Sequence, residues 1–203
     1  MFGTIRLLLA SVCFLILLII VNKSNIRAKR PMRVVVAVLS VVLCIATAFL
    51  PLENAFVSFD SPVASFEYYL FDNTGEKVVV DGMRCDMVIN HKSGKDTYLI
   101  VPKDSGGWKV GLGIDTKQVF QRSADGITII IHRYKNTDEY FVTVLNTDGE
   151  ELNLADEFGT AFVPVRRQTA LGNPLVTYYG HISIFNGIYH LSVNGNTIEA
   201  TVN

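Results

Sequence analysis

The sequence predicts a membrane-anchored, mainly β protein, with two N-terminal transmembrane helices followed by an antiparallel β-sandwich or barrel-like domain with one short leading helix. Three observations support this prediction. Of the 203 residues, 49% are hydrophobic and only 18% are charged, with a mean hydropathy of +0.31, whereas soluble domains usually carry about 25% charged residues. Two long apolar runs lie before residue 53. Short β-branched and aromatic segments, separated by turn residues, fill most of the remainder.

Residues 1–52 are predicted to form a transmembrane helical hairpin, with helices at about 5–21 and 34–52. The apolar runs Leu7–Val21 and Val34–Leu52 contain no charged residue, and a bilayer core needs roughly 20 helical residues. Between the helices, the segment 22–33 holds five basic residues and no acidic one, which is typical of a cytoplasmic loop. We therefore expect a multi-pass cell-membrane protein with two spans in the lipid bilayer. Both termini and the C-terminal domain are expected to be extracytoplasmic.

The second apolar run also allows an alternative. Ala46-Thr47-Ala48 has the spacing of small residues found at signal peptidase sites, and cleavage after Ala48 would release a secreted domain. In either case residues 53–203 form an extracytoplasmic β-rich domain. This domain holds twelve basic and nineteen acidic residues, a net charge of −7. Such a charge argues against nucleic acid as a partner, because nucleic-acid binding requires a basic surface.

One short helix is expected at the start of the β-rich domain, over Phe59–Leu70. Asp60 or Ser61 can cap its N-terminus, and Pro62 suits the first helical position because its missing N–H has no partner there. Val63, Phe66 and Leu70 then share one face. We expect this face to pack on a sheet.

The rest of the domain is predicted to consist of strands, with Asp-Gly, Asn-Gly and Gly-Gly turns between them. Strands at this spacing without intervening helices favour an antiparallel sandwich or barrel. The predicted strands are Lys77–Asp81, Cys85–His91, Thr97–Lys103, Trp108–Leu112, Val119–Arg122, Ile127–Tyr134, Tyr140–Asn146, Phe162–Arg166, Val176–Phe185, Ile188–Val193 and Thr197–Val202.

The last three strands are predicted to form a meander through two type I′ turns. A turn at Asn186-Gly187 pairs Phe185 with Ile188, and a turn at Asn194-Gly195 pairs Leu191 with Ile198. Both turns place apolar side chains on the same face of the sheet, which supports the register. That face contains Ile182, Ile184, Tyr189, Leu191, Val193, Ile198, Ala200 and Val202.

The chain also resembles a group of proteins of unknown activity. A basic two-helix hairpin followed by the segment FDSPVASF at Phe59–Phe66, and then by short strands, is similar to small uncharacterised bacterial membrane proteins with an exported β-rich domain. The resemblance covers about the first half of the chain. It implies the two-part architecture described above, and it implies no activity and no site.

Two histidines and a glutamate are the candidate metal ligands. In the predicted meander, His181 and His190 are diagonal neighbours on the polar face, about 7–8 Å apart at most, and Glu199 lies on the adjacent strand. Zinc sites require three protein ligands or more, with carboxylate and imidazole as common ones. The alternative interpretation is a solvated polar face without a metal.

No catalytic residue, cofactor site or metal site is assigned beyond these three candidates. The sequence contains no G-x-S-x-G segment, Gly111-Leu112-Gly113 is too short for a phosphate-binding loop, and Cys85 is expected to be a buried strand cysteine. We therefore expect a membrane-tethered binding, sensing or accessory module of the cell envelope with a protein or envelope partner, and not an enzyme. The alternative is a cell-envelope hydrolase with a site assembled from separated strands and loops.

Overall fold

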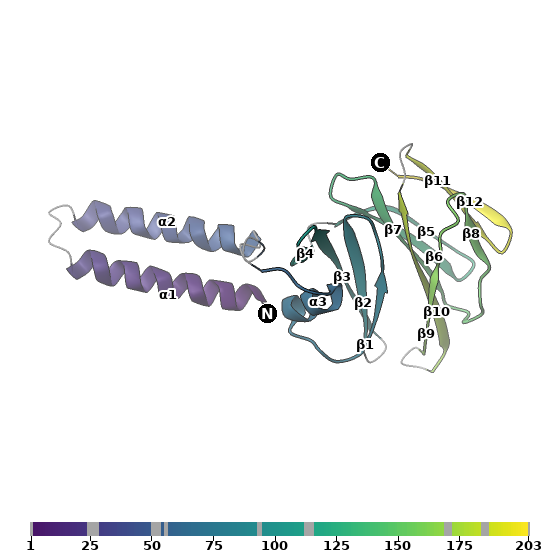
Figure 1. Ribbon diagram of the computed structural model, residues 1–203, viewed down its shortest axis with the longest axis horizontal. Coiled ribbons are helices and arrows are strands. Elements are labelled where there is room, and N and C mark those ends of the chain that lie inside the picture. Colours follow the sequence, from purple (N-terminus) through teal and green to yellow (C-terminus); the bar gives the residue numbers. More distant parts are fainter. Residues whose placement is uncertain are drawn as a thin grey trace.

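A computed structural model describes residues 2–23, 29–49, 54, 57–92, 95–111, 116–168, 172–183 and 187–202. Two helices at one end of the molecule lie side by side, and three β-sheets with a third, short helix make up the other end (Figure 1). The prediction of a mainly β domain with antiparallel strands is confirmed, because every strand pair that the structure describes is antiparallel.

The two N-terminal helices, α1 (Phe2–Lys23) and α2 (Lys29–Phe49), include charged residues that the sequence analysis placed in a loop. Lys29, Arg30 and Arg33 belong to the first turns of α2, so its uninterrupted apolar sequence begins only at Val34. A membrane span requires roughly 20 residues. Across the helical residues that the structure describes, none of the helices combines the length and the apolar composition needed to cross a membrane.

The prediction of two transmembrane helices is therefore wrong, and with it the two-span topology and the cell-membrane location derived from it. Of the predicted cytoplasmic loop 22–33, residues 24–28 lie outside the described residues, and the flanking residues belong to α1 and α2. Ala48, the alternative cleavage position, lies within α2.

The third helix, α3 (Pro62–Leu70), confirms the prediction for the start of the β-rich domain. Ser61 is the N-cap, and its hydroxyl accepts a hydrogen bond from the backbone N–H of Ala64 at 3.1 Å. Phe66 is fully buried, and Val63 and Leu70 pack beside it against the first sheet.

Twelve strands follow within the described residues, and the predicted segments correspond to eleven of them. They are β1 (Glu76–Val80), β2 (Cys85–Lys92), β3 (Lys95–Asp104), β4 (Gly107–Trp108), β5 (Thr116–Ala124), β6 (Ile127–Tyr134), β7 (Glu139–Asn146), β8 (Leu154–Asp156), β9 (Val163–Gln168), β10 (Pro174–Ser183), β11 (Ile188–Val193) and β12 (Asn196–Thr201). The three-residue strand β8 is the one that the sequence analysis missed, and β4 ends four residues before the predicted Leu112.

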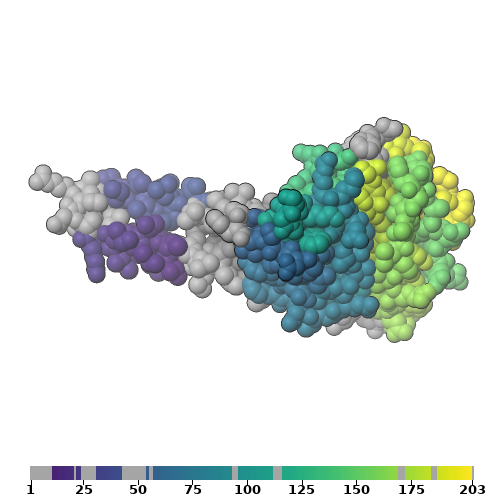
Figure 2. Space-filling model, in the orientation of Figure 1, coloured from purple at the N-terminus to yellow at the C-terminus, as the bar shows by residue number. Residues whose placement is uncertain are grey.

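The strands form three sheets that stack as layers, with α3 on the outside of the first (Figure 1). The first sheet has the order β1-β2-β3-β4, the second β5-β6-β7-β10-β9, and the third β12-β11-β8. In the space-filling view the first sheet, in blue, lies on the side of the two helices, and the green and yellow strands of the other two sheets lie on the far side of it (Figure 2).

Three apolar clusters hold the layers together. Phe66 of α3 packs on the outer face of the first sheet with Val88, Leu99 and Val101. The inner face of that sheet packs against the five-stranded sheet through a cluster that includes Met87. The opposite face of the five-stranded sheet packs against the third sheet. Because the central sheet is covered on both faces, its strands β7 and β10 are buried almost continuously.

The β11–β12 hairpin confirms the predicted turn at Asn194-Gly195. Both residues have positive φ angles, 50° and 84°, as a type I′ turn requires. Leu191 pairs with Ile198 and Tyr189 pairs with Ala200, in the register that the alternation of apolar residues predicts.

The other predicted hairpin, between β10 and β11, is wrong. Strand β10 pairs with β7 on one side and β9 on the other, and β11 pairs with β12 and β8, so neither strand has an edge left for the other. The chain instead crosses from the central sheet to the third sheet. Ile184, Phe185 and Asn186 lie outside the described residues. The apolar residues of both strands still share one core because the two sheets face each other.

Candidate functional site

The three candidate metal ligands are distributed over two sheets. His181 lies on β10 in the central sheet, whereas His190 on β11 and Glu199 on β12 are paired neighbours in the third sheet. His181 contacts Glu139, with 3.4 Å between Nε2 and Oε2, and His190 contacts Glu157, with 3.0 Å between Nδ1 and Oε2. The structure does not bring the three together, and no group of three metal-ligating side chains occurs among the residues that it describes.

His181 belongs instead to a buried polar cluster around Glu139, the first residue of β7. Glu139 is fully buried. Its two carboxylate oxygens accept hydrogen bonds from the backbone N–H groups of Met83 at 3.1 Å and Arg84 at 2.8 Å. The thiol of Cys85 lies 3.6 Å from Oε2. Glu139 thereby fixes the connection between β1 and β2 to the central sheet.

A cysteine, a histidine and a glutamate in contact resemble the residues of a thiol enzyme, but the electrostatics oppose that chemistry. Burial and the neighbouring Glu139 carboxylate raise the pKa of the Cys85 thiol. Burial lowers the pKa of His181, against the opposing effect of Glu139. Because the thiolate is the nucleophile of such enzymes, Cys85 is held in its unreactive form. This agrees with its prediction as a buried strand cysteine.

A second polar cluster joins the first and central sheets at Asp96 of β3. The Asp96 carboxylate pairs with Arg167 of β9, accepts a hydrogen bond from the Tyr179 hydroxyl of β10 at 2.7 Å, and lies 2.6 Å from Nδ1 of His91. Burial lowers the pKa of His91, and it raises the pKa of Tyr179 together with the hydrogen bond to Asp96. These contacts join the first and central sheets, which is a structural arrangement.

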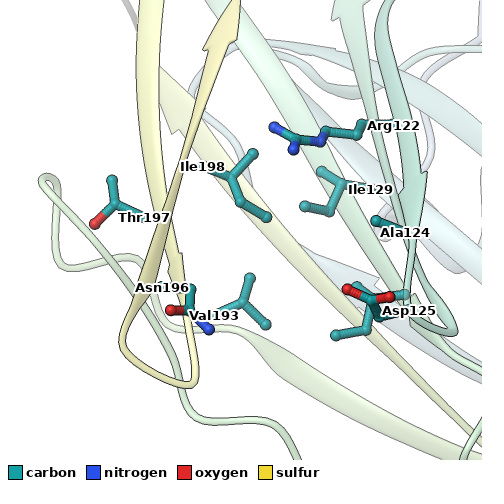
Figure 3. Close-up of a pocket in the computed structure, with 9 residues that line it drawn as sticks. Arg122, Ala124, Asp125, Ile129, Val193, Asn196, Thr197 and Ile198 are labelled. Carbon is teal, nitrogen blue, oxygen red and sulfur yellow. The ribbon is translucent and has the colours of Figure 1, made fainter.

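An open cleft of about 290 Å³ lies between the central and third sheets, on the side of β5 and β12. Its walls come from two hairpins far apart in the sequence, β5–β6 and β11–β12 (Figure 3). The apolar part comprises Ile127, Ile129, Val193 and Ile198, of which Ile129 and Val193 are buried. Figure 3 shows Ile129 and Ile198 facing each other across the cleft.

The rim of the cleft is polar and exposed. It is formed by Arg122, Asp125, Asn196 and Thr197. Among the described residues, none of these four side chains has a hydrogen-bond or ion-pair partner. An apolar floor with a few polar groups around it is the usual composition of a ligand pocket. The rim groups are free to bind a ligand, unlike those of the Glu139 and Asp96 clusters, which are bound to each other.

The cleft is not among the predictions from the sequence. Arg122, the isoleucines of β6 and Thr197 lie in predicted strands and receive no functional role there. No local pattern indicates that the Asp125-Gly126 turn and the β11–β12 hairpin lie beside each other, because that depends on how the third sheet packs on the second. The available signal was the position of Arg122 next to a turn, on a strand with few apolar residues.

Comparison of the chain with protein-family models, with curated proteins and with solved structures finds no match. The resemblance to small bacterial membrane proteins therefore stays a prediction.

Proposed function

We propose that the β-rich domain is a binding module, and that its site is the cleft between the β5–β6 and β11–β12 hairpins. The observation that carries the proposal is an open cleft with an apolar floor, whose polar rim groups have no internal partners among the described residues. A dry apolar cavity of about 150 Å³ is large enough to bind benzene, and this cleft is larger, at about 290 Å³.

The chemistry of the lining defines the ligand. The floor accepts an apolar side chain or an apolar group of similar size. The rim offers a cation at Arg122, a carboxylate at Asp125, an amide at Asn196 and a hydroxyl at Thr197, so it can both donate and accept hydrogen bonds. A ligand with an apolar group beside amide groups satisfies both parts. The proposed ligand class is therefore an apolar residue within a peptide.

The hydrolase alternative receives no support from the cleft. Among the described residues that line it, there is no histidine or cysteine, and its single hydroxyl, on Thr197, has no neighbouring base in contact. Nucleophilic catalysis requires such a pair within hydrogen-bond reach.

The proposal is tested with the full chain carrying ¹³C-labelled isoleucine methyl groups, titrated with N-acetyl-leucinamide and observed by NMR. We expect the methyl signals of Ile129 and Ile198 to shift. Those of Ile89 and Ile100, in the apolar cluster between the first and central sheets, should not shift. N-acetyl-glycinamide, which lacks the apolar side chain, is the matched ligand control and should leave all four signals unchanged.

Two variants localise the binding. Ile198→Trp fills the cleft and should abolish the shift at Ile129. Ile188→Trp introduces the same side chain on the same hairpin, at a position that is 43% exposed and outside the cleft lining, and should preserve it. Equal responses of the two variants, or no response of the unmodified chain up to the solubility limit of the ligand, would refute the proposal.

A further inference from the structure

Strand β5 is an exposed edge with unusual length. It spans nine residues, Thr116–Ala124, and lies at the end of the central sheet, paired with β6. The other edge strands that the structure describes are shorter, with two to six residues, and β9, at the opposite edge of the same sheet, contains Pro164. Short strands, proline, bulges and charged side chains are the usual protections of sheet edges. β5 has neither a short length nor a proline; its protections are a bulge and basic side chains, which leave the edge open to a strand of complementary charge.

A bulge in β5 determines which side chains face the cleft. The pairing with β6 shifts between Gln118 and Phe120, so these two residues are consecutive positions of the ladder and the alternation of faces is reset. Lys117 therefore shares a face with Phe120, Arg122 and Ala124. This is the face that meets the third sheet, because Phe120 packs against the core between the two sheets and both Arg122 and Ala124 line the cleft.

The cleft-side face of β5 is cationic. Lys117 and Arg122 are its charged members, the strand contains no acidic residue, and no ion pair of either side chain is formed with the described residues. A strand added beside β5 would place its alternate side chains directly opposite those of β5. The position of the added strand opposite Arg122 suits a residue with a carboxylate. The side chain opposite the small Ala124 enters the cleft.

We propose that β5 is the acceptor edge for an extended peptide segment of a partner protein, with the pattern apolar-x-acidic. The apolar side chain enters the cleft and the acidic one, two positions away on the same face, pairs with Arg122. Backbone hydrogen bonds to an edge strand supply affinity, and pockets for alternate side chains supply specificity, in this mode of recognition. The inference rests on the proposed function of the cleft and names its partner.

A second copy of this chain is a poorer occupant. If β5 paired with β5 of a second copy, both strands would carry Lys117 and Arg122, and neither would carry an acidic residue. Like charges on neighbouring strands destabilise the pairing.

The test uses the full chain and an acetylated, fluorescein-labelled heptapeptide, TVTLTET, which contains the apolar-x-acidic pattern, measured by fluorescence anisotropy. In an extended strand, alternate N–H groups point to opposite edges. One peptide N-methylated at its even positions and one N-methylated at its odd positions therefore differ only in the edge that is blocked. We expect one of the two to lose at least tenfold in affinity and the other to bind like the parent peptide.

The charge pairing has its own variants. Arg122→Glu should weaken binding of the peptide at least tenfold, and replacing the glutamate of the peptide with lysine should restore it. Arg166→Glu, an equivalent change on the opposite edge strand β9, is the matched control and should leave binding unchanged. Circular dichroism checks that both variants keep the fold.

The outcomes separate this inference from the proposed function. If N-acetyl-leucinamide shifts Ile129 and Ile198 but both N-methylated peptides bind equally, or the peptide binds no more tightly than leucinamide, strand addition is refuted and the cleft stands. If leucinamide also fails, both proposals fall. A rise in the mass of the chain on its own, reversed by adding the peptide, would identify the occupant as a second copy and overturn the inference.

Discussion

Replacing Glu139 with alanine should destabilise the fold far more than an ordinary surface change. Its carboxylate is fully buried and accepts two backbone hydrogen bonds, from Met83 and Arg84. The substitution removes both hydrogen bonds, which are partly buried, and the loss of each costs about 1–3 kcal/mol. The expected loss is therefore about 2–6 kcal/mol, a large part of the 5–15 kcal/mol that typically stabilises a domain.

Urea denaturation of the full chain measures this loss. With a slope of about 2 kcal/mol per M, a loss of about 3 kcal/mol lowers the midpoint by about 1.5 M. Glu139→Gln keeps one acceptor oxygen and should lie between the parent and Glu139→Ala. The control is Asp138→Ala, which removes a pair with the exposed Arg84 at 3.6 Å and should cost less than about 1 kcal/mol. Equal midpoints for Glu139→Ala and Asp138→Ala would refute the role given to Glu139.

Three further predictions concern stability and reactivity. Burial lowers the pKa of His91 and His181, so the unfolded chain takes up protons at about pH 6.5 while the folded chain does not. The urea midpoint should therefore fall as the pH decreases below about 6.5, until the lower folded pKa is passed; a midpoint that rises would contradict this. In a variant without the other two cysteines, iodoacetamide should modify Cys85 much more slowly in the folded chain than in denaturant, because the thiol is buried and its pKa is raised; similar rates would show it to be accessible. Gly195→Val places a β-branched residue at a φ of 84° and should lower stability by about 1–2 kcal/mol, seen as a lower urea midpoint; an unchanged midpoint would exclude strain at the turn.

The parts of the fold that follow from local rules could be predicted from the sequence. Ser61 and Pro62 fix the start of α3 through one capping hydrogen bond and one missing donor. The Asn194-Gly195 turn sets the register of β11 and β12, because both residues accept positive φ angles. Each of these features depends on a few residues that are close in the chain.

The pairing of β10 required information that the sequence pattern does not contain. Alternating apolar residues are equally consistent with β11 beside β10 in one sheet and β11 facing β10 across a core. The partner that decides between them is β9. The prediction that α1 and α2 span a membrane is wrong for a different reason. Apolar runs alone predicted spans, whereas the charged residues between the runs extend the helices.

The cleft could not be predicted from the sequence, because none of its features depends on residues that are close in the chain. Arg122 and Thr197 are far apart in the chain, and they share a rim only after the third sheet packs against the second. The bulge in β5, which aligns Lys117 with Arg122, is visible only in the pairing with β6. The buried cluster of Glu139 was missed in the same way, since its partners come from the connection before β2 and from β10.

Intermolecular NOEs between N-acetyl-leucinamide and the isoleucine methyl groups of the full chain test the binding cleft most directly. We predict NOEs from the leucine methyl groups of the ligand to Ile129 and Ile198, which face each other in the cleft (Figure 3), and their loss in Ile198→Trp. NOEs confined to isoleucines outside the cleft, such as Ile188, or NOEs that persist unchanged in Ile198→Trp, would contradict a binding site between the β5–β6 and β11–β12 hairpins.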